Sequence, residues 1–355
     1  MKDRTKRAIV LMNLGSPDST EVKDVKKYLD EFLMDKRVID YPYLLRLLLV
    51  KGIIIPARVK NSAEAYHTIW TKDGSPLIIF TNQLRNSLQE RTVDAVAIMM
   101  RYGPPTPDET FSALLKKIPD LEEVLLIPMY PHYAMSSYET AVLHARDSYR
   151  RNRFPFKLKF IKPFYNNDDY LNALAESMKP YLQQDYDHVL FSYHGIPERH
   201  ILKTDRTHQH CLSSPDCCDI ASKAHETCYR HQCFYTTKKV VQRAGIPEGK
   251  FSNSFQSRIG KKWLTPYTDI RLEEMPKEGI KKLLVVCPAF VSDCLETLEE
   301  IAIRGKETFM NAGGESYEMI PCMNVNSVWV ECLAKWIRDY ESGDSSMILN
   351  ESILA

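Results

Sequence analysis

The chain has 355 residues, with 47 basic and 46 acidic side chains and a formal net charge of +1. This length exceeds that of one ordinary domain and predicts two. The balanced charge argues against a general attraction to nucleic acid, so the expected partner is a small molecule. No apolar run approaches the roughly 18 residues of a membrane span, and the first residues carry no secretory pattern, so the predicted location is cytoplasmic.

Short apolar runs that favour β-structure recur along the chain, with helical patterns between them. They cover residues 8–14, 93–100, 124–129, 158–161, 188–192, 283–287 and 317–320. Nearly continuous apolar strands that alternate with helices are typical of doubly wound parallel sheets. The succession occurs twice and predicts an α/β fold with two domains: 1–163, completed by a C-terminal helix at 326–342, and 164–325.

Residues 41–56 form a very apolar stretch. Because Arg46 and Lys51 interrupt it, the stretch cannot cross a bilayer. Two interpretations stay open, a helix buried in the core or an exposed apolar lip that lies in a membrane interface. The second interpretation predicts peripheral contact with the inner face of the membrane.

A histidine follows a predicted buried strand in the second half of the chain. Residues 186–191 are mostly apolar, and Gly195 and Pro197 end the strand at once. His194 is therefore predicted at the carboxyl end of a parallel strand, where open α/β sheets bind ligands. A lone histidine is more often a core residue with satisfied ring nitrogens, and the flanking glycine weakens that alternative.

The strand predicted at 282–290 leads into a helix that begins with several carboxylates. Asp293 and Glu296 have the spacing of a capping box, which would give both a purely structural role. Glu296 and Glu300 also lie one turn apart on one helix face, so both can point into the same cleft. The capping box explains one glutamate better than two.

Five of the nine cysteines are clustered: Cys211, Cys217, Cys218, Cys228 and Cys233. Disulfides do not suit a chain without an export signal, and scattered buried thiols would not cluster, so a metal centre is predicted. A 2Fe-2S cluster takes four thiolates, and zinc takes four thiolates or a mixture with histidine. The histidines near the cysteines are His208, His210, His225 and His231. The spacing alone leaves both metals open, although adjacent Cys217 and Cys218 suit two irons somewhat better.

Several segments together resemble the ferrochelatases, enzymes that insert Fe(II) into a porphyrin at the last step of haem synthesis. The resemblance runs from about residue 7 to residue 340 and includes 14–17, 74–77, 100–103, 130–133, 192–197, 256–258, 263–269 and 288–300. So many matches in order are far more specific than one motif. The resemblance implies two similar doubly wound domains with parallel sheets, of the chelatase type, and an active-site cleft between them that holds the porphyrin.

The resemblance also assigns roles to single residues. It implies that His194 and Glu296 are catalytic and contact the substrate iron. It implies further porphyrin-binding positions: Leu14, Arg101, Tyr102, Tyr130, Trp263, Phe290, Asp293 and Glu300. Leu14 stands where some relatives carry Met or Tyr near the metal site, which argues against a protein ligand to iron at this position.

Some bacterial relatives carry cluster cysteines in an insertion after the histidine motif, and residues 200–233 resemble that insertion. The resemblance therefore implies a 2Fe-2S cluster, with zinc as the less favoured metal. The implied ligands are Cys211, Cys217, Cys218 and Cys228. Cys233 is left out because relatives without a cluster can also have a cysteine there.

Metal insertion removes two pyrrole protons while iron reaches the ring nitrogens. A neutral His194 can accept a proton, and Glu296 and Glu300 can relay protons or guide Fe(II). The predicted function is therefore a lyase that inserts Fe(II) into a porphyrin, protoporphyrin IX above all. Two alternatives remain: a non-catalytic haem or iron carrier that senses redox state, and a cobalt chelatase. Cobalt chelatases typically have a second histidine at the position of Glu296.

Overall fold

The computed structural model describes residues 6–354, and the chain divides into two compact units. Unit 1 comprises Met1–Met129, Met135–Lys162 and Leu333–Asn350, and unit 2 comprises Tyr130–Ala134, Pro163–Cys332 and Glu351–Ala355. The predicted domains, 1–163 with 326–342 and 164–325, stay a prediction. The units differ from them in detail, because Tyr130–Ala134 belongs to unit 2 and the last helix, α12 (Ser327–Glu341), is divided after Cys332.

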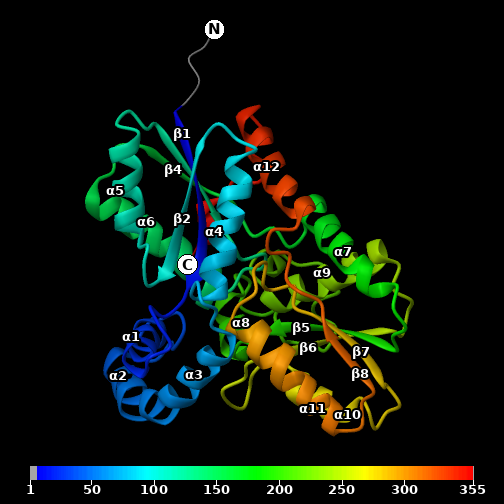
Figure 1. Cartoon of the computed structure of the whole chain (residues 1–355). Coiled ribbons are helices and arrows are strands. Elements are labelled where there is room, and N and C mark those ends of the chain that lie inside the picture. The colour runs from blue at the N-terminus through cyan, green and yellow to red at the C-terminus, as the bar shows by residue number, and fades with distance from the viewer. Residues whose placement is uncertain (1–5, 355) are drawn as a thin grey trace. The chain divides into compact units, whose positions relative to one another are not determined.

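Unit 1 is built on a parallel four-stranded sheet with the order β2-β1-β3-β4 (Figure 1). Its strands are β1 (Arg7–Gly15), β2 (Ala95–Tyr102), β3 (Glu123–Pro128) and β4 (Lys157–Phe160). The two central strands, β1 and β3, are buried along nearly their whole length. Helices cover both faces of such a sheet, which is why both strands are continuous apolar runs in the sequence.

The helices of unit 1 are α1 (Val22–Leu33), α2 (Tyr43–Leu49), α3 (Ile55–Ile69), α4 (Pro76–Gln89), α5 (Pro107–Lys117) and α6 (Thr140–Asn152). Two π-helical segments, η1 (Val50–Ile54) and η2 (Met135–Glu139), precede α3 and α6. Helix α4 lies on one side of β1 and β2, and α5 and α6 lie on the other (Figure 1). Local chemistry begins α5: Thr106 and Glu109 form a capping box, and Pro107 occupies the first turn.

Unit 2 has a second parallel four-stranded sheet with the order β6-β5-β7-β8. Its strands are β5 (His188–His194), β6 (Phe251–Gln256), β7 (Lys282–Val286) and β8 (Ser316–Met319). In both units the first strand along the chain lies between the second and the third. This repetition confirms the predicted class of two similar, doubly wound α/β sheets.

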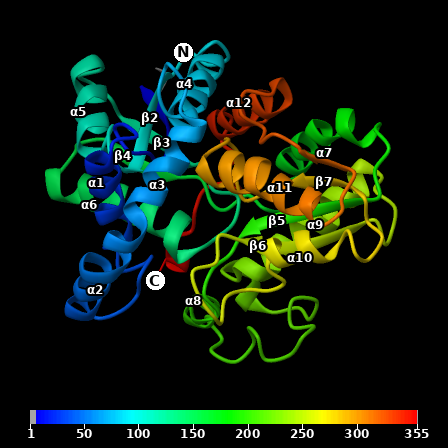
Figure 2. The same cartoon turned by 60° about the horizontal axis from the view of Figure 1, so that its bottom comes forward.

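The helices of unit 2 are α7 (Asp168–Leu182), α8 (Glu198–Thr204), η3 (Lys223–Glu226), α9 (Tyr229–Ala244), α10 (Thr268–Glu274), η4 (Glu296–Gly305), α11 (Lys306–Asn311) and η5 (Glu351–Ile353). Helices α7 and α9 lie on one side of β5 and β6, and α10 and α11 on the other (Figure 1). Leu190, Val285, Ile301 and Phe309 belong to one buried apolar cluster, which fixes η4 and α11 against the sheet. The chain between α8 and α9 lies outside the sheet as a loop (Figure 2).

The apolar stretch at 41–56 is an exposed helical segment rather than a core helix. Leu44 and Leu48 are 72% and 69% exposed, whereas Arg46 is only 8% exposed. The Nη1 of Arg46 donates to the carbonyls of Ile39 and Tyr41, which satisfies part of the buried guanidinium. Leucine thus faces solvent and arginine faces the protein, the reverse of a core helix. Within residues 6–354, no helix is both long and apolar enough to cross a membrane.

Candidate active site

The carboxyl ends of β5 and β7 meet where the strand order of unit 2 reverses. The chain passes from β5 to β6 on one side and then returns to β7 on the other. Doubly wound sheets bind ligands in the crevice at this position. His194 is the last residue of β5, and Glu296 follows β7 at the start of η4.

Gly195 lets β5 and β6 approach closely beside His194. Its N–H donates to the carbonyl of Gln256 over 2.8 Å. A Cβ atom at position 195 would lie 2.7 Å from that same carbonyl oxygen, closer than a carbon atom can approach. The glycine predicted from the sequence to end the strand therefore also fixes the position of the histidine before it.

The ring of His194 is held in one orientation. Its Nδ1 lies 2.6 Å from the carbonyl oxygen of Gly195. Because a carbonyl oxygen only accepts, we assign the proton of the neutral ring to Nδ1, which leaves the lone pair on Nε2. The ring also lies 6.2 Å from that of Phe290, between centroids, and the carbonyl of His194 accepts the hydroxyl of Tyr229. These contacts fix the ring and leave Nε2 available as a hydrogen-bond acceptor.

Glu300 lies close enough to His194 and Glu296 to interact with both electrostatically. Its carboxyl accepts two hydrogen bonds from one residue, from the N–H of Ser257 at 2.7 Å and from its hydroxyl at 2.5 Å. Burial raises the pKa of Glu300, and the charge of Glu296 raises it further, whereas Ser257 and His194 oppose the rise. The net effect is a carboxyl group that holds its proton more firmly than an exposed one.

Asp293 does not form the capping box with Glu296 that the sequence allows. The N–H of Asp293 donates to Asn324, and its buried carboxylate accepts from Thr297, Asn324 and the N–H of Cys322. Thr297, not Glu296, also accepts the N–H of Cys294 at the start of the helix. The side chain of Glu296 accepts the Cys294 thiol and is not used as a cap. The structural alternative for Glu296 is therefore wrong.

Two other predicted residues of unit 2, Trp263 and Phe290, lie beside His194 and Gly195. Trp263 pairs with Pro197 through an isolated bridge, and its ring would lie 3.4 Å from a Cβ at Gly195. Phe290 thus lies near the ring of His194, and Trp263 packs beside Gly195. Tyr130 is buried within the same unit.

In unit 1, Arg101 and Tyr102 belong to a polar network that the sequence did not predict. Arg101 donates to Asp35 at 2.5 Å and to Thr140 at 2.9 Å, and the hydroxyl of Tyr102 donates to the same carboxylate at 3.0 Å. Burial would raise the pKa of Asp35, but Arg101 and the two hydroxyls outweigh it and hold the pKa below its usual value. No motif marks Asp35, so only the fold identifies it.

Leu14, near the end of β1, is only partly exposed, and its N–H donates to the side chain of Asn13. Gly15 follows with a φ of +104° and faces the carbonyl of Tyr102, where a Cβ would collide. The close pairing of Gly15 with Tyr102 thus fixes the end of β1, directly after Leu14.

The four cysteines predicted as ligands are buried, and each thiol contacts at least one of the other three. The thiol of Cys228 hydrogen-bonds to those of Cys211 and Cys218, and Cys218 also contacts Cys217. Cys233 differs, because its thiol is fully buried beside the hydroxyl of Tyr229. In residues 6–354, no three or more His, Cys, Asp or Glu side chains are arranged so that they could hold a metal ion as they stand.

Asp205 organises the loop before the first of these cysteines. Its buried carboxylate accepts the N–H groups of Thr207, His210 and Cys211 and the hydroxyl of Thr207. Burial raises the pKa of Asp205, but these hydrogen bonds outweigh it and leave the pKa far below its usual value. The loop therefore has a hydrogen-bonded framework of its own.

Comparison with known proteins decides the family. A family model described as Ferrochelatase matches residues 6–341. The chain belongs to the ferrochelatase family. Two curated ferrochelatases illustrate the similarity: that of Opitutus terrae is 50% identical, with 94% of this chain and 97% of that protein covered. That of Pseudomonas entomophila is 47% identical, with 93% and 98% covered.

The fold agrees with this assignment. SirB from Bacillus subtilis with Fe3+ matches with a TM-score of 0.54 at 11% identity, over 96% of this chain and 98% of that one. At such low identity the match shows a shared fold alone. Ferrochelatase membership makes the chain a lyase that inserts iron into a porphyrin during haem synthesis, as predicted. The carrier and the cobalt chelatase are not favoured.

Proposed function

We propose that His194 is the base that removes pyrrole protons during metal insertion. The observation that carries this role is the hydrogen bond between Nδ1 and the carbonyl of Gly195, at 2.6 Å. With the proton on Nδ1, the lone pair of Nε2 accepts a pyrrole proton, and the imidazolium that forms keeps its bond to the carbonyl. The nitrogen that loses its proton becomes a ligand for iron.

Glu296 and Glu300 handle the protons that leave the ring and guide Fe(II) toward it. The raised pKa of Glu300 suits a group that takes up a proton and passes it on. Glu296 starts the same helix and lies near enough to raise that pKa through its charge. Carboxylate and imidazole groups are both acceptable ligands for Fe(II), so His194 and Glu296 are the proposed contacts to the substrate iron.

The proposed porphyrin, protoporphyrin IX, has candidate contacts among aromatic and polar groups of each unit. Phe290 and Trp263 offer ring surfaces beside His194, where flat apolar faces favour a flat macrocycle. Asp293 accepts the hydroxyl of Thr297 and so holds the helix that carries Glu296. Tyr130, also in unit 2, is a further proposed contact to the porphyrin. Unit 1 contributes Leu14 and Arg101, with the buried Tyr102 as the ring on which Arg101 stacks at 4.2 Å.

The clustered cysteines fit a 2Fe-2S group better than one zinc ion. Four thiols surround a single tetrahedral metal ion, whereas each iron of a 2Fe-2S group takes two thiolates. The thiol of Cys228 contacts those of Cys211 and Cys218, and Cys218 contacts Cys217, so the four thiols can supply two contacting pairs. When bound, the cluster supplies four Fe–S bonds that cross-link the loop.

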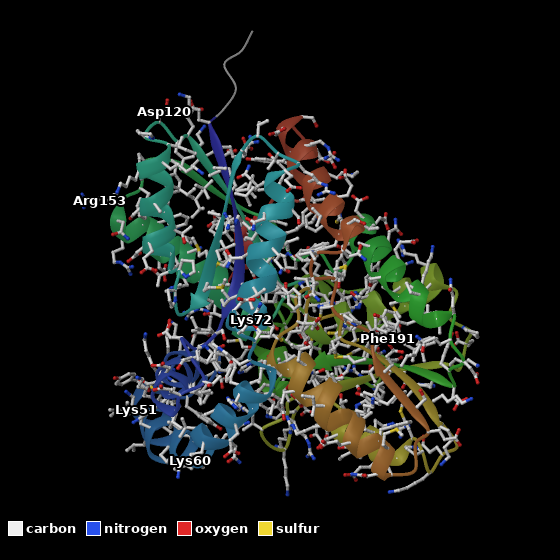
Figure 3. The ribbon with its side chains drawn as sticks, viewed as in Figure 1. Lys51, Lys60, Lys72, Asp120, Arg153 and Phe191 are labelled. Carbon is white, nitrogen blue, oxygen red and sulfur yellow. The ribbon has the colours of Figure 1, made fainter. Side chains whose placement is uncertain are left out.

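Peripheral membrane contact is proposed through residues 41–56. Its exposed apolar side chains are Tyr41, Tyr43, Leu44, Leu45, Leu48 and Ile53. The substrate of this protein is poorly soluble in water. An exposed apolar patch of this kind suits binding to the apolar region of a membrane surface. Lys51 within the segment and Lys60 shortly after it are exposed and can meet anionic headgroups, although Lys51 also pairs with Asp30 at 3.2 Å (Figure 3).

An anaerobic assay of the purified protein with Fe(II) and protoporphyrin IX tests the proposed roles. Wild-type protein should form haem catalytically, seen as many turnovers in the visible spectrum. His194→Ala should bind porphyrin and form almost none. Catalysis at the wild-type rate in this variant would remove His194 from the mechanism, and wild-type protein that binds porphyrin without turnover would restore the carrier alternative.

A further inference from the structure

Arg230 is the one basic side chain hydrogen-bonded to sulfur atoms of the proposed cluster site, within residues 6–354. Its Nη1 lies 3.6 Å from the Sγ of Cys217 and 3.5 Å from the Sγ of Cys218. One nitrogen of the guanidinium thus faces both members of the adjacent cysteine pair.

The guanidinium of Arg230 is fixed by other contacts. Its second terminal nitrogen donates to the carbonyl of Pro215 at 3.4 Å. Its plane lies over the ring of Phe234, one turn further along α9, at 4.9 Å from the centroid. Arg230 is half-buried, so solvent screens its charge less than that of a freely exposed side chain.

The backbone of the cysteine pair is held by different residues. The carbonyl of Cys217 lies 2.7 Å from Nε2 of His210, and the carbonyl of Cys218 lies 2.7 Å from Nδ1 of His231. Two imidazoles therefore contact the main chain of the cysteine pair, whereas Arg230 contacts the sulfur atoms of the pair and the carbonyl of Pro215. Removing Arg230 should leave the loop in place and change mainly the charge around the sulfurs.

We propose that Arg230 tunes the redox equilibrium of the cluster by stabilising its reduced form. This inference rests on the proposed function of the four cysteines as 2Fe-2S ligands. One-electron reduction adds one negative charge to a group already ligated by thiolates, and hydrogen bonds and positive charge at the sulfurs favour it. The neighbouring Asp216 and Asp219 are exposed acidic residues that act in the opposite direction. Arg230 therefore raises the reduction potential of the site.

The test compares midpoint potentials of the full chain, prepared anaerobically. Wild type, R230Q, R230K and the control R206Q are titrated with dithionite as the electron donor, and the reduced cluster is followed by electron paramagnetic resonance. Arg206 belongs to the same loop and pairs with Glu226 at 3.8 Å, so R206Q removes an equal charge away from the sulfurs. R230Q should lower the ratio of reduced to oxidised cluster about tenfold at a given potential, which is about 59 mV for one electron. R230K should fall between, and R206Q should match wild type.

The outcomes separate this inference from the proposal on which it rests. Wild-type protein without acid-labile sulfide would refute the cluster itself before any variant is made. If wild-type protein contains the cluster, equal shifts of the midpoint potential in R230Q and R206Q, or no shift in either, would refute only the role of Arg230 and not the cluster. If R230Q holds no cluster, R230K decides, because lysine keeps the positive charge but loses the planar guanidinium that also bonds to Pro215 and lies over Phe234. A wild-type potential in R230K, or loss of the cluster in both variants, would overturn the inference.

Discussion

Ser257 binds both oxygens of the Glu300 carboxyl, one through its main-chain N–H and one through its hydroxyl, although the two residues lie on different elements of unit 2. Ser257 directly follows β6 and has a φ of +62°, which turns its N–H and its side chain toward the helix. This contact opposes the effect of burial on the pKa of Glu300.

The raised pKa of Glu300 predicts a pH dependence of stability. The folded state keeps the proton above the usual pKa of 4.5, so this residue's contribution to stability is complete below pH 4.5 and is lost as pH rises through the higher folded pKa. Glu300→Gln should abolish that decline. Urea unfolding of both proteins at a series of pH values measures it, and parallel curves would show that the pKa is not raised.

His194→Ala should lower kcat by about 100- to 10,000-fold, the usual contribution of a general base, while porphyrin affinity changes little. Initial rates of haem formation and porphyrin fluorescence quenching measure the two effects. His188→Ala is the matched control, because His188 lies at the other end of the same strand and bonds to Ser252. Equal losses of activity in both variants would point to damage of β5 rather than to loss of the base.

Glu296→Gln and Asp293→Ala should separate catalysis from structure. Glu296 is not a helix cap, so its amide variant should lose most activity and keep its melting temperature. Asp293→Ala leaves the side chains of Thr297 and Asn324 without their buried acceptor and should cost about 1–3 kcal/mol of stability. Thermal unfolding and turnover are measured on both. A large loss of stability in Glu296→Gln with normal turnover would restore the capping interpretation.

Replacing Leu44 and Leu48 by Ser should weaken binding to anionic vesicles and raise the KM for porphyrin. Both side chains are mostly exposed, so stability should change by less than about 0.5 kcal/mol per site. Leu202→Ser is the control, since Leu202 is 52% exposed in unit 2. Vesicle sedimentation and steady-state kinetics give the result. Unaltered binding in the double variant would show that the patch does not contact membranes.

Protein purified without oxygen should be brown and contain about two irons and two sulfides per chain, as expected of a 2Fe-2S cluster. Cys217→Ser should bleach it, because each of the four proposed ligands is required. Cys233→Ser should keep the colour, since that thiol contacts Tyr229. Metal analysis and visible absorbance are the measurements. One zinc per chain without sulfide would reject the cluster, and bleaching by Cys233→Ser would change the ligand set.

Much of the architecture follows from apolar periodicity, but one strand does not. Strand β6 has the sequence Phe-Ser-Asn-Ser-Phe-Gln and was not predicted, because it lies at an edge of its sheet and needs no continuous apolar run. The residues at its end, Gln256 and Ser257, hold Glu296 and Glu300. The sequence motifs pointed to Glu296 and Glu300 as candidate site residues. Only the fold shows that Gln256 and Ser257 hydrogen-bond to them.

The exposure of the helix at 43–49 could not be predicted from its apolar residues, for a different reason. Leucines on a soluble protein are expected inside, so a core helix was a reasonable alternative. Burial of Arg46 depends on the carbonyls of Ile39 and Tyr41, which precede the helix in a loop whose path no periodicity encodes. Side-chain orientation here is set by loop geometry.

The carbonyl and the N–H of Gly195 both belong to peptide groups of the main chain, and together they set which nitrogen of His194 carries the proton. The hydrogen bond that fixes the tautomer comes from the main chain, whereas Glu300 acts on His194 through its charge. Side-chain substitutions around His194 can therefore change the shape and charge of the site without changing the tautomer of His194. A shift in the pairing of β5 with β6 would move the Gly195 carbonyl, which makes the strand register itself a determinant of reactivity.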